Sequence, residues 1–327
     1  MNDRTTRRRV LGGALVTSAG LIGAARAQAQ WPTKPVRILI SFPPGGSSDF
    51  VARVLTPYLS EQLGQQFIVD NRPGAGGTVA ADILKKEAPD GYNFMISNNA
   101  PFTIAPTQFK KIPYDPLRDF THITYLGSTF GGLLAHPKIG VKTLPELVAK
   151  AKAEPGKFTY GSSGVGSIGH ISGETFRRLS GIDILHIPYK GAGPLRLDFA
   201  AGVVDMQFEG IVSNLPAIRA GALVALAAAS AERLPPAPDV PTFREQGFDM
   251  TMENWHGMTA PARLPSVIAD RFHQVLIELL QRQEVLDKLA TYGVFYKAMT
   301  GPAFAAYVGQ QIEVWKPQII AAGVAGQ

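Results

Sequence analysis

The chain has 327 residues, a formal net charge of +6 and a hydrophobic fraction of 45%, and it contains no cysteine. A chain of this length exceeds the size at which a single hydrophobic core usually stops growing, so two lobes are expected. Without cysteine, neither a disulfide scaffold nor thiol chemistry is available.

The first segment of the chain predicts export. Four arginines lie within residues 1–9, and an uncharged run follows over residues 10–25. Small residues suitable for cleavage come next, so the pattern indicates a signal peptide over residues 1–29. Residues 6–11 also resemble the twin-arginine export signature, and both that route and ordinary secretion stay open.

Removal of this segment lowers the net charge of the chain. It carries five arginines and one aspartate, so it supplies four of the six net positive charges and leaves +2 on the mature chain. No basic block survives, and a nucleic-acid partner is therefore not expected. No later apolar run is long enough to span a bilayer, so a soluble exported protein is predicted.

Short apolar strands alternate with helical patterns along the mature chain. A strand over residues 36–42 leads through a loop to a helix over residues 49–63, with Ser48 as the expected N-cap and Gly64 as the stop. Pro57 predicts a kink or break in that helix. Further strands are expected at 67–70, 92–97, 158–160, 184–187, 203–208 and 223–228, and helices at 78–86, 143–153, 167–179, 194–201, 214–220, 266–282, 283–292 and 302–322. This order predicts an α/β fold with mainly parallel sheets flanked by helices.

Two extended segments, at residues 123–135 and 249–260, are the expected crossings between lobes. Two crossings place both chain ends in one lobe. The predicted lobe 1 therefore comprises residues 30–128 plus 256–327, and lobe 2 comprises residues 129–255. Candidate hinge residues are the glycines in and beside the crossings, Gly131, Gly132 and Gly257.

Two Gly/Ser-rich loops form the candidate binding site, because each follows a strand and opens a helix. The first spans residues 43–48, and the second spans residues 161–166 and is followed by Ser167. Ligands bind at this edge of an open α/β sheet, and the N–H groups at a helix start favour an anionic oxygen. Simple tight turns with helix caps are the alternative interpretation.

The second loop also matches the G-x-G-x-x-G pattern of dinucleotide-binding folds at residues 164–169. Its mid-chain position departs from the usual fingerprint, and Asp183 lies at the start rather than the end of the next strand. An exported NAD(P)-dependent oxidoreductase is therefore the alternative function. No G-x-S-x-G motif supports a hydrolase, and the histidine spacing supports no zinc site.

Asp205 lies in the apolar strand predicted over residues 203–208, which leaves two interpretations. The carboxylate could pair with a buried backbone group or an arginine, or it could accept a hydrogen bond from a ligand in the cleft. Three aromatic residues could likewise either wall the ligand or belong to the core: Phe42, Phe208 and Trp255.

Motifs spread over essentially all of the mature chain carry a family resemblance. They lie at residues 31–36, 42–49, 69–77, 160–164, 186–191 and 201–205. Together they make the chain resemble the Bug family of extracytoplasmic solute receptors, the substrate-binding components of tripartite tricarboxylate transporters.

The resemblance implies a two-lobed periplasmic-binding-protein fold of type II that closes on a small carboxylate without performing chemistry. It implies that N–H groups, hydroxyls and ordered water at the two loops hold the ligand, and that membrane permease subunits driven by a chemical gradient receive it. A periplasmic monomer without cofactor or metal is expected. The predicted ligand-binding residues are Phe42, Pro44, Gly45, Gly46, Ser47, Ser48, Asp49, Asn98, Ser162, Ser163, Gly166, Ser167, His170, Tyr189 and Asp205.

Overall fold

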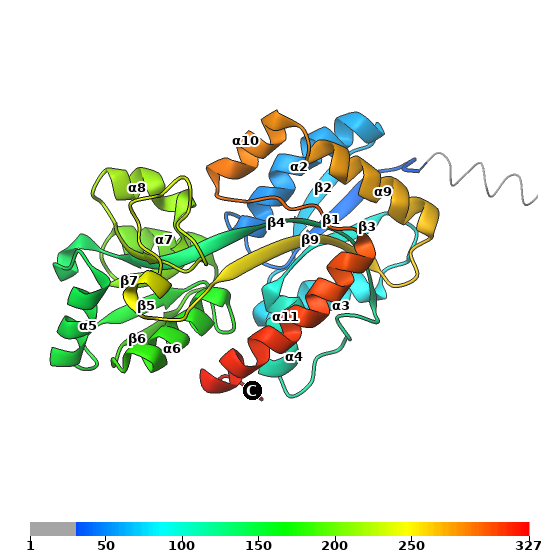
Figure 1. Cartoon of the computed structure of the whole chain (residues 1–327). Coiled ribbons are helices and arrows are strands. Elements are labelled where there is room, and N and C mark those ends of the chain that lie inside the picture. The colour runs from blue at the N-terminus through cyan, green and yellow to red at the C-terminus, as the bar shows by residue number, and fades with distance from the viewer. Residues whose placement is uncertain (1–30, 327) are drawn as a thin grey trace, which may run out of the picture.

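The computed structural model describes residues 31–326, which fold into two lobes that lie side by side (Figure 1). The predicted signal peptide lies outside the described residues. Two long strands, β4 (Phe120–Ala135) and β9 (Glu253–Pro261), run from one lobe into the other. Among the helices of the described part, none is both long and apolar enough to cross a membrane.

Lobe 1 contains the first and the last elements of the described chain. In chain order these are β1 (Val36–Ile40), α2 (Ser47–Leu63), β2 (Phe67–Asn71), α3 (Thr78–Lys86), β3 (Asn93–Asn98), α4 (Ala105–Gln108), α9 (Ser266–Leu279), α10 (Gln283–Thr291) and α11 (Gly301–Ala321). Figure 1 shows α2, α9 and α10 gathered on one side of the lobe and α3, α4 and α11 on the other.

Lobe 2 is built from the middle of the chain. Its elements are α5 (Leu144–Ala153), β5 (Thr159–Ser162), α6 (Ile168–Ser180), β6 (Leu185–Pro188), α7 (Ala192–Ala200), β7 (Met206–Gly210), α8 (Leu215–Arg219) and β8 (Val224–Ala228). The strands and helices predicted from the sequence are confirmed here, with bounds that shift by a few residues. The predicted α/β class is therefore confirmed in both lobes.

The nine strands of the described residues form one curled sheet in the order β2-β1-β3-β9-β4-β7-β5-β6, with β8 paired to β4. Strand β1 pairs in parallel with β2 and β3, and β5 pairs in parallel with β6 and β7. The crossing strands differ, because β9 pairs antiparallel with β3 and β4, and β4 pairs antiparallel with β7 and β8. The expectation of mainly parallel sheets thus holds only for the strands joined through helices, since β4 and β9 traverse both lobes in opposite directions.

The first helix corrects two local predictions. Helix α2 begins at Ser47 with Gly46 as its N-cap, so Ser48 is already inside the helix and is not the cap. Pro57 does not break α2, which continues to Leu63 and ends as predicted at Gly64, in the left-handed conformation with φ 69°. Burial of one apolar stripe against β1 and β2 stabilises the helix enough to tolerate the hydrogen bond that proline removes.

Close packing explains the glycines of the crossing strands. A Cβ atom on Gly131 would lie 2.4 Å from the sulfur of Met252, and one on Gly257 would lie 2.0 Å from the ring of Phe304. A Cβ on Gly132 would lie 2.3 Å from the carbonyl oxygen of Ala227. These positions therefore exclude any side chain, and a hinge role for them stays a prediction.

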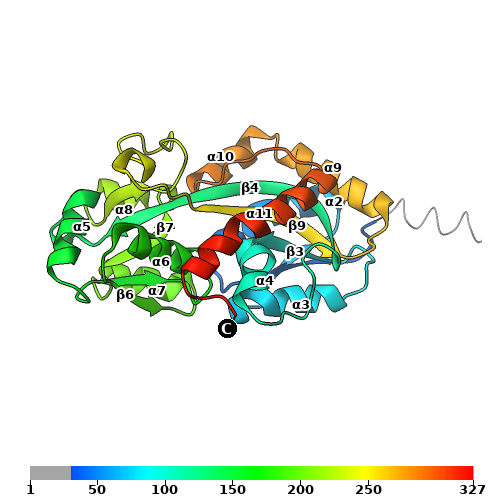
Figure 2. The ribbon, with the colours of Figure 1, turned by 60° about the horizontal axis from the view of Figure 1, so that its bottom comes forward.

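The C-terminal helix contacts the cores of both lobes. Near its start, Phe304 packs with Trp255 in a core cluster of lobe 1. Near its end, Trp315 and Ile319 belong to the core cluster of lobe 2 that contains Phe208. Figure 2 shows α11 running diagonally from lobe 1 to the edge of lobe 2. A division into lobes at the two crossing strands therefore leaves α11 as a third contact between them.

Candidate ligand-binding site

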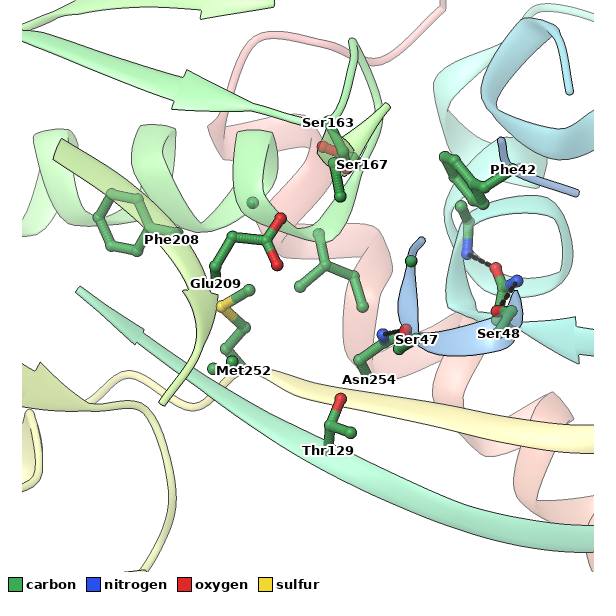
Figure 3. A pocket seen from close by; sticks show the side chains of 18 of the residues that line it. Phe42, Ser47, Ser48, Thr129, Ser163, Ser167, Phe208, Glu209, Met252 and Asn254 are labelled. Carbon is green, nitrogen blue, oxygen red and sulfur yellow. Dashed lines mark hydrogen bonds between the residues drawn. The ribbon is translucent and has the colours of Figure 1, made fainter. Parts of the chain in front are cut away.

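A pocket lies between the two lobes and is lined by both (Figure 3). Lobe 1 contributes the loop after β1, the start of α2 and the end of β3, and lobe 2 contributes the start of α6 and the end of β7. The lining residues are Phe42, Pro43, Gly46, Ser47, Ser48, Asp49, Asn98, Ala100, Thr129, Gly131, Ser163, Ser167, Ile168, Gly169, Ala192, Phe208, Glu209, Gly210, Met252, Asn254 and Tyr292.

The start of α2 presents backbone donors to the pocket. The first hydrogen bond of the helix runs from the N–H of Phe50 to the carbonyl oxygen of Gly46, over 3.0 Å. The N–H groups of Ser47 and Ser48 lie ahead of it and have no partner inside the helix. Gly45 has φ +94°, a conformation that favours glycine and turns the loop into the helix. The lobe 1 wall is thus suited to an anionic oxygen.

Side chains from β3 and β9 fix the hydroxyls of this wall. The Nδ2 amide of Asn254 donates to Ser47 Oγ over 2.9 Å, and that of Asn98 donates to Ser48 Oγ over 3.1 Å. Ser48 Oγ also lies 3.3 Å from Nδ1 of His256. Burial lowers the pKa of His256 to about 3, so this imidazole is neutral at physiological pH. The wall is therefore ordered before any ligand arrives.

Asp49 orders the loop rather than offering a free charge. One carboxylate oxygen accepts from the N–H of Gly45 over 3.0 Å and from Nε of Arg53 over 2.9 Å. The other oxygen accepts from Nδ2 of Asn71 over 3.1 Å. Burial alone would raise the pKa of Asp49, but the hydrogen bonds from Arg53, Gly45 and Asn71 lower it below its usual value. Asp49 is therefore ionised and its charge is neutralised within lobe 1.

The start of α6 provides the matching donors from lobe 2. Ser167 is the N-cap, and its Oγ accepts from the N–H of His170 over 3.3 Å. The N–H groups of Ile168 and Gly169 lie ahead of the first intrahelical bond, which runs from Ile171. A Cβ atom on Gly169 would lie 2.8 Å from the carbonyl oxygen of Phe208, so only glycine permits this approach of α6 to β7.

Two stacked histidines support the second loop from behind. The rings of His170 and His186 are 4.1 Å apart and inclined by 14°. Nδ1 of His170 accepts from the N–H of Gly166 over 3.1 Å, and Nε2 of His186 lies 2.7 Å from Ser162 Oγ. Burial and then the neighbouring His170 lower the pKa of His186 to about 3, and burial lowers that of His170. Both rings are therefore neutral supports of the loop.

The structure brings eight of the fifteen predicted residues to the pocket, namely Phe42, Gly46, Ser47, Ser48, Asp49, Asn98, Ser163 and Ser167. The other seven do not line it: Pro44, Gly45, Ser162, Gly166, His170, Tyr189 and Asp205. Several of these order the loops, as Gly45, Gly166 and His170 do.

Asp205 belongs to a structural network outside the pocket. Its carboxylate accepts from the N–H and Oγ1 of Thr159 over 2.8 and 2.9 Å, and it pairs with Nζ of Lys138 over 2.8 Å. Asp205 thus pairs with a backbone group and a cation, which is the first of the two sequence interpretations, although the cation is a lysine and not an arginine. Among the aromatic candidates, Phe42 and Phe208 line the pocket, whereas Trp255 lies in the core of lobe 1.

The sequence prediction missed several pocket residues, above all Glu209, Asn254 and Tyr292. Glu209 follows the buried Phe208 at the end of β7, and a carboxylate at the C-terminal end of an apolar strand was the available signal. Asn254 and Tyr292 reach the pocket from β9 and from the end of α10, and no local motif marks either of them.

Comparisons with known proteins identify the family of this two-lobed protein. The model of the tripartite tricarboxylate transporter family receptor matches residues 51–324. The chain belongs to this family. Protein BugT of Bordetella pertussis is 33% identical over 305 residues, which cover 93% of each chain. A protein encoded in the tcbD-tcbE intergenic region of Pseudomonas sp. strain P51 is 30% identical over 320 residues, 96% of this chain and 94% of that protein.

Solved structures show the same fold. The Rhodopseudomonas palustris protein Rpa4515 with adipate has a TM-score of 0.87 at 30% identity, covering 91% of this chain and 100% of that one. MatC from the same organism, with bound malate, has a TM-score of 0.81 at 30% identity over 88% of this chain and 100% of that one. The periplasmic binding protein BugD has a TM-score of 0.85 at 28% identity, covering 91% of this chain and 100% of that one.

Membership of this family identifies the chain as a periplasmic solute receptor and not an enzyme. The family gives no support to the oxidoreductase alternative. In the structure, Gly164 and Gly166 of the dinucleotide-like pattern adopt φ +138° and +76°, so they turn the loop between β5 and α6.

Proposed function

We propose that this chain captures one small carboxylate between its lobes and delivers it to the membrane subunits of a gradient-driven tripartite transporter. The observation that carries this proposal is the pair of helix starts, of α2 and α6, on opposite walls of one pocket. Each start offers unpaired N–H groups and the positive end of a helix dipole. The described residues that line the pocket include no lysine or arginine, so N–H groups and hydroxyls would hold the anion.

The proposed contacts follow from the geometry of the two walls. In lobe 1 the carboxylate would accept from the N–H groups and hydroxyls of Ser47 and Ser48. In lobe 2 the ligand would meet Ser163, Ser167 and the N–H of Gly169. The relatives whose structures hold adipate and malate support a small carboxylate as the ligand.

We also propose that ligand binding closes the lobes about the crossing strands, with lobe 1 at residues 30–128 plus 256–327 and lobe 2 at residues 129–255. The two lobes already contact each other, since Nη2 of Arg196 in α7 donates to the carbonyl oxygen of Gly45 over 3.5 Å. A bridging ligand would stabilise a closed form of the two lobes by its higher affinity for that form. Solution scattering should give a smaller radius of gyration with ligand than without, and identical curves with proven binding would reject the closure.

We also propose that the chain is exported and acts as a monomer. The residues before the described part would direct the chain to the periplasm and be removed, leaving a monomer that begins near Gln28 or Gln30. N-terminal sequencing of the protein from periplasmic extracts checks this, and a chain that keeps Met1 would contradict it.

The test of function is a thermal-shift screen of the exported protein against small carboxylic acids, with NADP⁺ as the control. A ligand that binds only the folded state at 100 times its Kd should add about 2.7 kcal/mol to the free energy of unfolding. We expect at least one carboxylate to raise Tm and NADP⁺ to leave it unchanged. Stabilisation by NADP⁺ and by no acid would overturn the proposed function.

A further inference from the structure

The pocket that should receive an anion carries two acidic side chains on its walls. Asp49 and Glu209 both line it, and the lining residues of the described chain include no histidine, lysine or arginine. Asp49 is neutralised by Arg53 and by two further donors within lobe 1. Glu209 forms no ion pair with any described residue. The two walls of the pocket therefore differ in charge.

Glu209 points into the space that the ligand would fill. It is the fourth residue of β7, and its carboxylate lies between Met252 and the serines of the second loop, Ser163 and Ser167 (Figure 3). The start of α2, with Ser47, lies on the opposite side of the same space. A ligand that spans the pocket would thus have one end at α2 and the other near Glu209.

The surroundings leave this carboxylate poorly compensated. Burial raises the pKa of Glu209 to about 6, although Arg196 and the N–H of Gly210 partly oppose the effect. Arg196 reaches from α7, lines a neighbouring depression and donates to the loop of lobe 1. The phenol of Tyr292 and the carboxylate of Asp49 are the other titratable groups near it. At pH 7.5 the Glu209 side chain is therefore mostly ionised, and no cation among the described residues forms an ion pair with it.

We propose that the cognate ligand is a carboxylate that also carries an ammonium group, with its carboxylate at the start of α2 and its ammonium against Glu209. This inference rests on the proposed function, of which it names the ligand class. An ammonium group supplies the missing cation, and a hydrogen bond between two charged groups is the strong kind. A second ligand carboxylate would instead meet a like charge. A diacid fits only if Glu209 takes up a proton, at a cost of roughly 30-fold in affinity at pH 7.5 for a pKa near 6.

Matched ligands test the proposal by calorimetry at pH 7.5 on the exported protein. The diacids succinate, glutarate and adipate are compared with 4-aminobutanoate, 5-aminopentanoate and 6-aminohexanoate, in which an ammonium group replaces one carboxylate. Glutarate is also compared with L-glutamate, which adds an ammonium group. We expect the ammonium-bearing partner of at least one pair to bind about tenfold or more tightly.

Two variants with the same chemical change assign this preference to a residue. Glu209→Gln should remove or reverse it, because the neutral amide neither attracts an ammonium group nor repels a carboxylate. Glu232→Gln changes an exposed glutamate of lobe 2 outside the pocket lining and should leave the preference intact. The inference would be overturned if the parent protein binds the diacids more tightly than their ammonium-bearing partners. It would also be overturned if Glu209→Gln keeps the preference for the ammonium-bearing ligands. Neither result would contradict the capture of a carboxylate. Binding of no carboxylate at all would overturn the proposed function itself.

A measurement without ligand checks the same carboxylate. A folded-state pKa near 6, above the usual 4.5, means that the stability contributed by protonated Glu209 is present below pH 4.5 and is lost as pH rises through 6. Glu209→Gln should therefore match the parent in Tm at pH 4.5 and exceed it at pH 7.5. If Glu209→Gln and the parent have the same Tm at pH 4.5 and also at pH 7.5, the charge of Glu209 is compensated in the empty pocket. This result would overturn the inference.

Discussion

The two walls of the pocket differ in how completely their polar groups are paired. In lobe 1, Ser47 and Ser48 each hold a hydrogen bond from another element, and Asp49 is neutralised. In lobe 2, Glu209 faces the pocket without an ion pair among the described residues. The paired wall of lobe 1 is suited to any carboxylate, because it is preorganised and its one carboxylate, Asp49, is already neutralised. The unpaired wall of lobe 2 discriminates between ligands, since whatever meets Glu209 decides whether this half-buried charge is compensated.

The largest expected effect comes from filling the lobe 1 wall. Gly46 has φ −85° and ψ 174°, which any residue adopts, and a Cβ atom there meets no atom within 4 Å. The valine side chain of Gly46→Val would therefore enter the space of the ligand without straining the fold. We expect calorimetry to detect no carboxylate binding, and circular dichroism to show an unchanged fold.

A matched variant controls for the added side chain. Gly193 in α7 also has open space around its Cβ position, and it does not line the pocket. Gly193→Val should bind as the parent does. If Gly46→Val also binds as tightly as the parent, the start of α2 is not the anion site.

A smaller effect is expected from loosening the paired wall. The side chain of Asn98 donates to Ser41 over 2.9 Å and to Ser48 over 3.1 Å, and it accepts from the N–H of Ala100 over 3.1 Å. Asn98→Ala leaves these buried groups without their partner and should lower the free energy of unfolding by about 1–3 kcal/mol in urea titrations.

The lobe 2 counterpart of this experiment is Ser163→Ala. No hydrogen bond of the Ser163 hydroxyl occurs among the described residues, so its removal should leave the stability of the empty protein unchanged. Equal losses of stability in Asn98→Ala and Ser163→Ala would contradict the claimed difference between the walls.

The last predicted effect is the pH dependence of the two walls. The pKa of His256 behind the lobe 1 wall is lowered to about 3, so the folded state keeps it neutral while the unfolded chain binds a proton near pH 6.5. Its contribution to stability is present above pH 6.5 and is lost as pH falls toward 3. Glu209 behaves oppositely between pH 4.5 and 6.

Urea unfolding at several pH values separates the two contributions. From pH 7 to pH 4 the parent should lose stability, because His186 and His122, with pKa values lowered to about 3 and about 4, act in the same direction as His256. The loss should be steeper in Glu209→Gln, which lacks the opposing carboxylate. A parent that gains stability on acidification would contradict the neutral histidines.

The sequence predicts the two loops that open α2 and α6 better than the rest of the site, and locality explains why. Ser47, Ser48, Ser163 and Ser167 lie in loops that follow a strand and open a helix, and such loops meet at one edge of the sheet. Each loop signals its function within about six residues of chain. The βα units that carry them are also local patterns, so the fold class is predictable in the same way.

The remaining site residues depend on contacts between distant segments. Asn254 donates to Ser47 across 207 residues of sequence, and Tyr292 reaches the pocket from the end of α10. The correct role of Asp205 depends on Lys138 and Thr159, which no spacing rule connects to it. The parallel pairing expected from βα units fails at β4 and β9, because a strand that crosses both lobes pairs with whatever lies beside it.

Backbone amide spectra of the exported protein test the central claim most directly. We expect titration with the carboxylate that gives the largest rise in Tm to shift the N–H resonances of Ser47 and Ser48 in lobe 1. Those of Ile168 and Gly169 in lobe 2 should shift at the same ligand concentrations, because one molecule accepts from both helix starts. Saturation of the protein without shifts at either helix start, or with shifts at only one of them, would contradict capture between the two lobes.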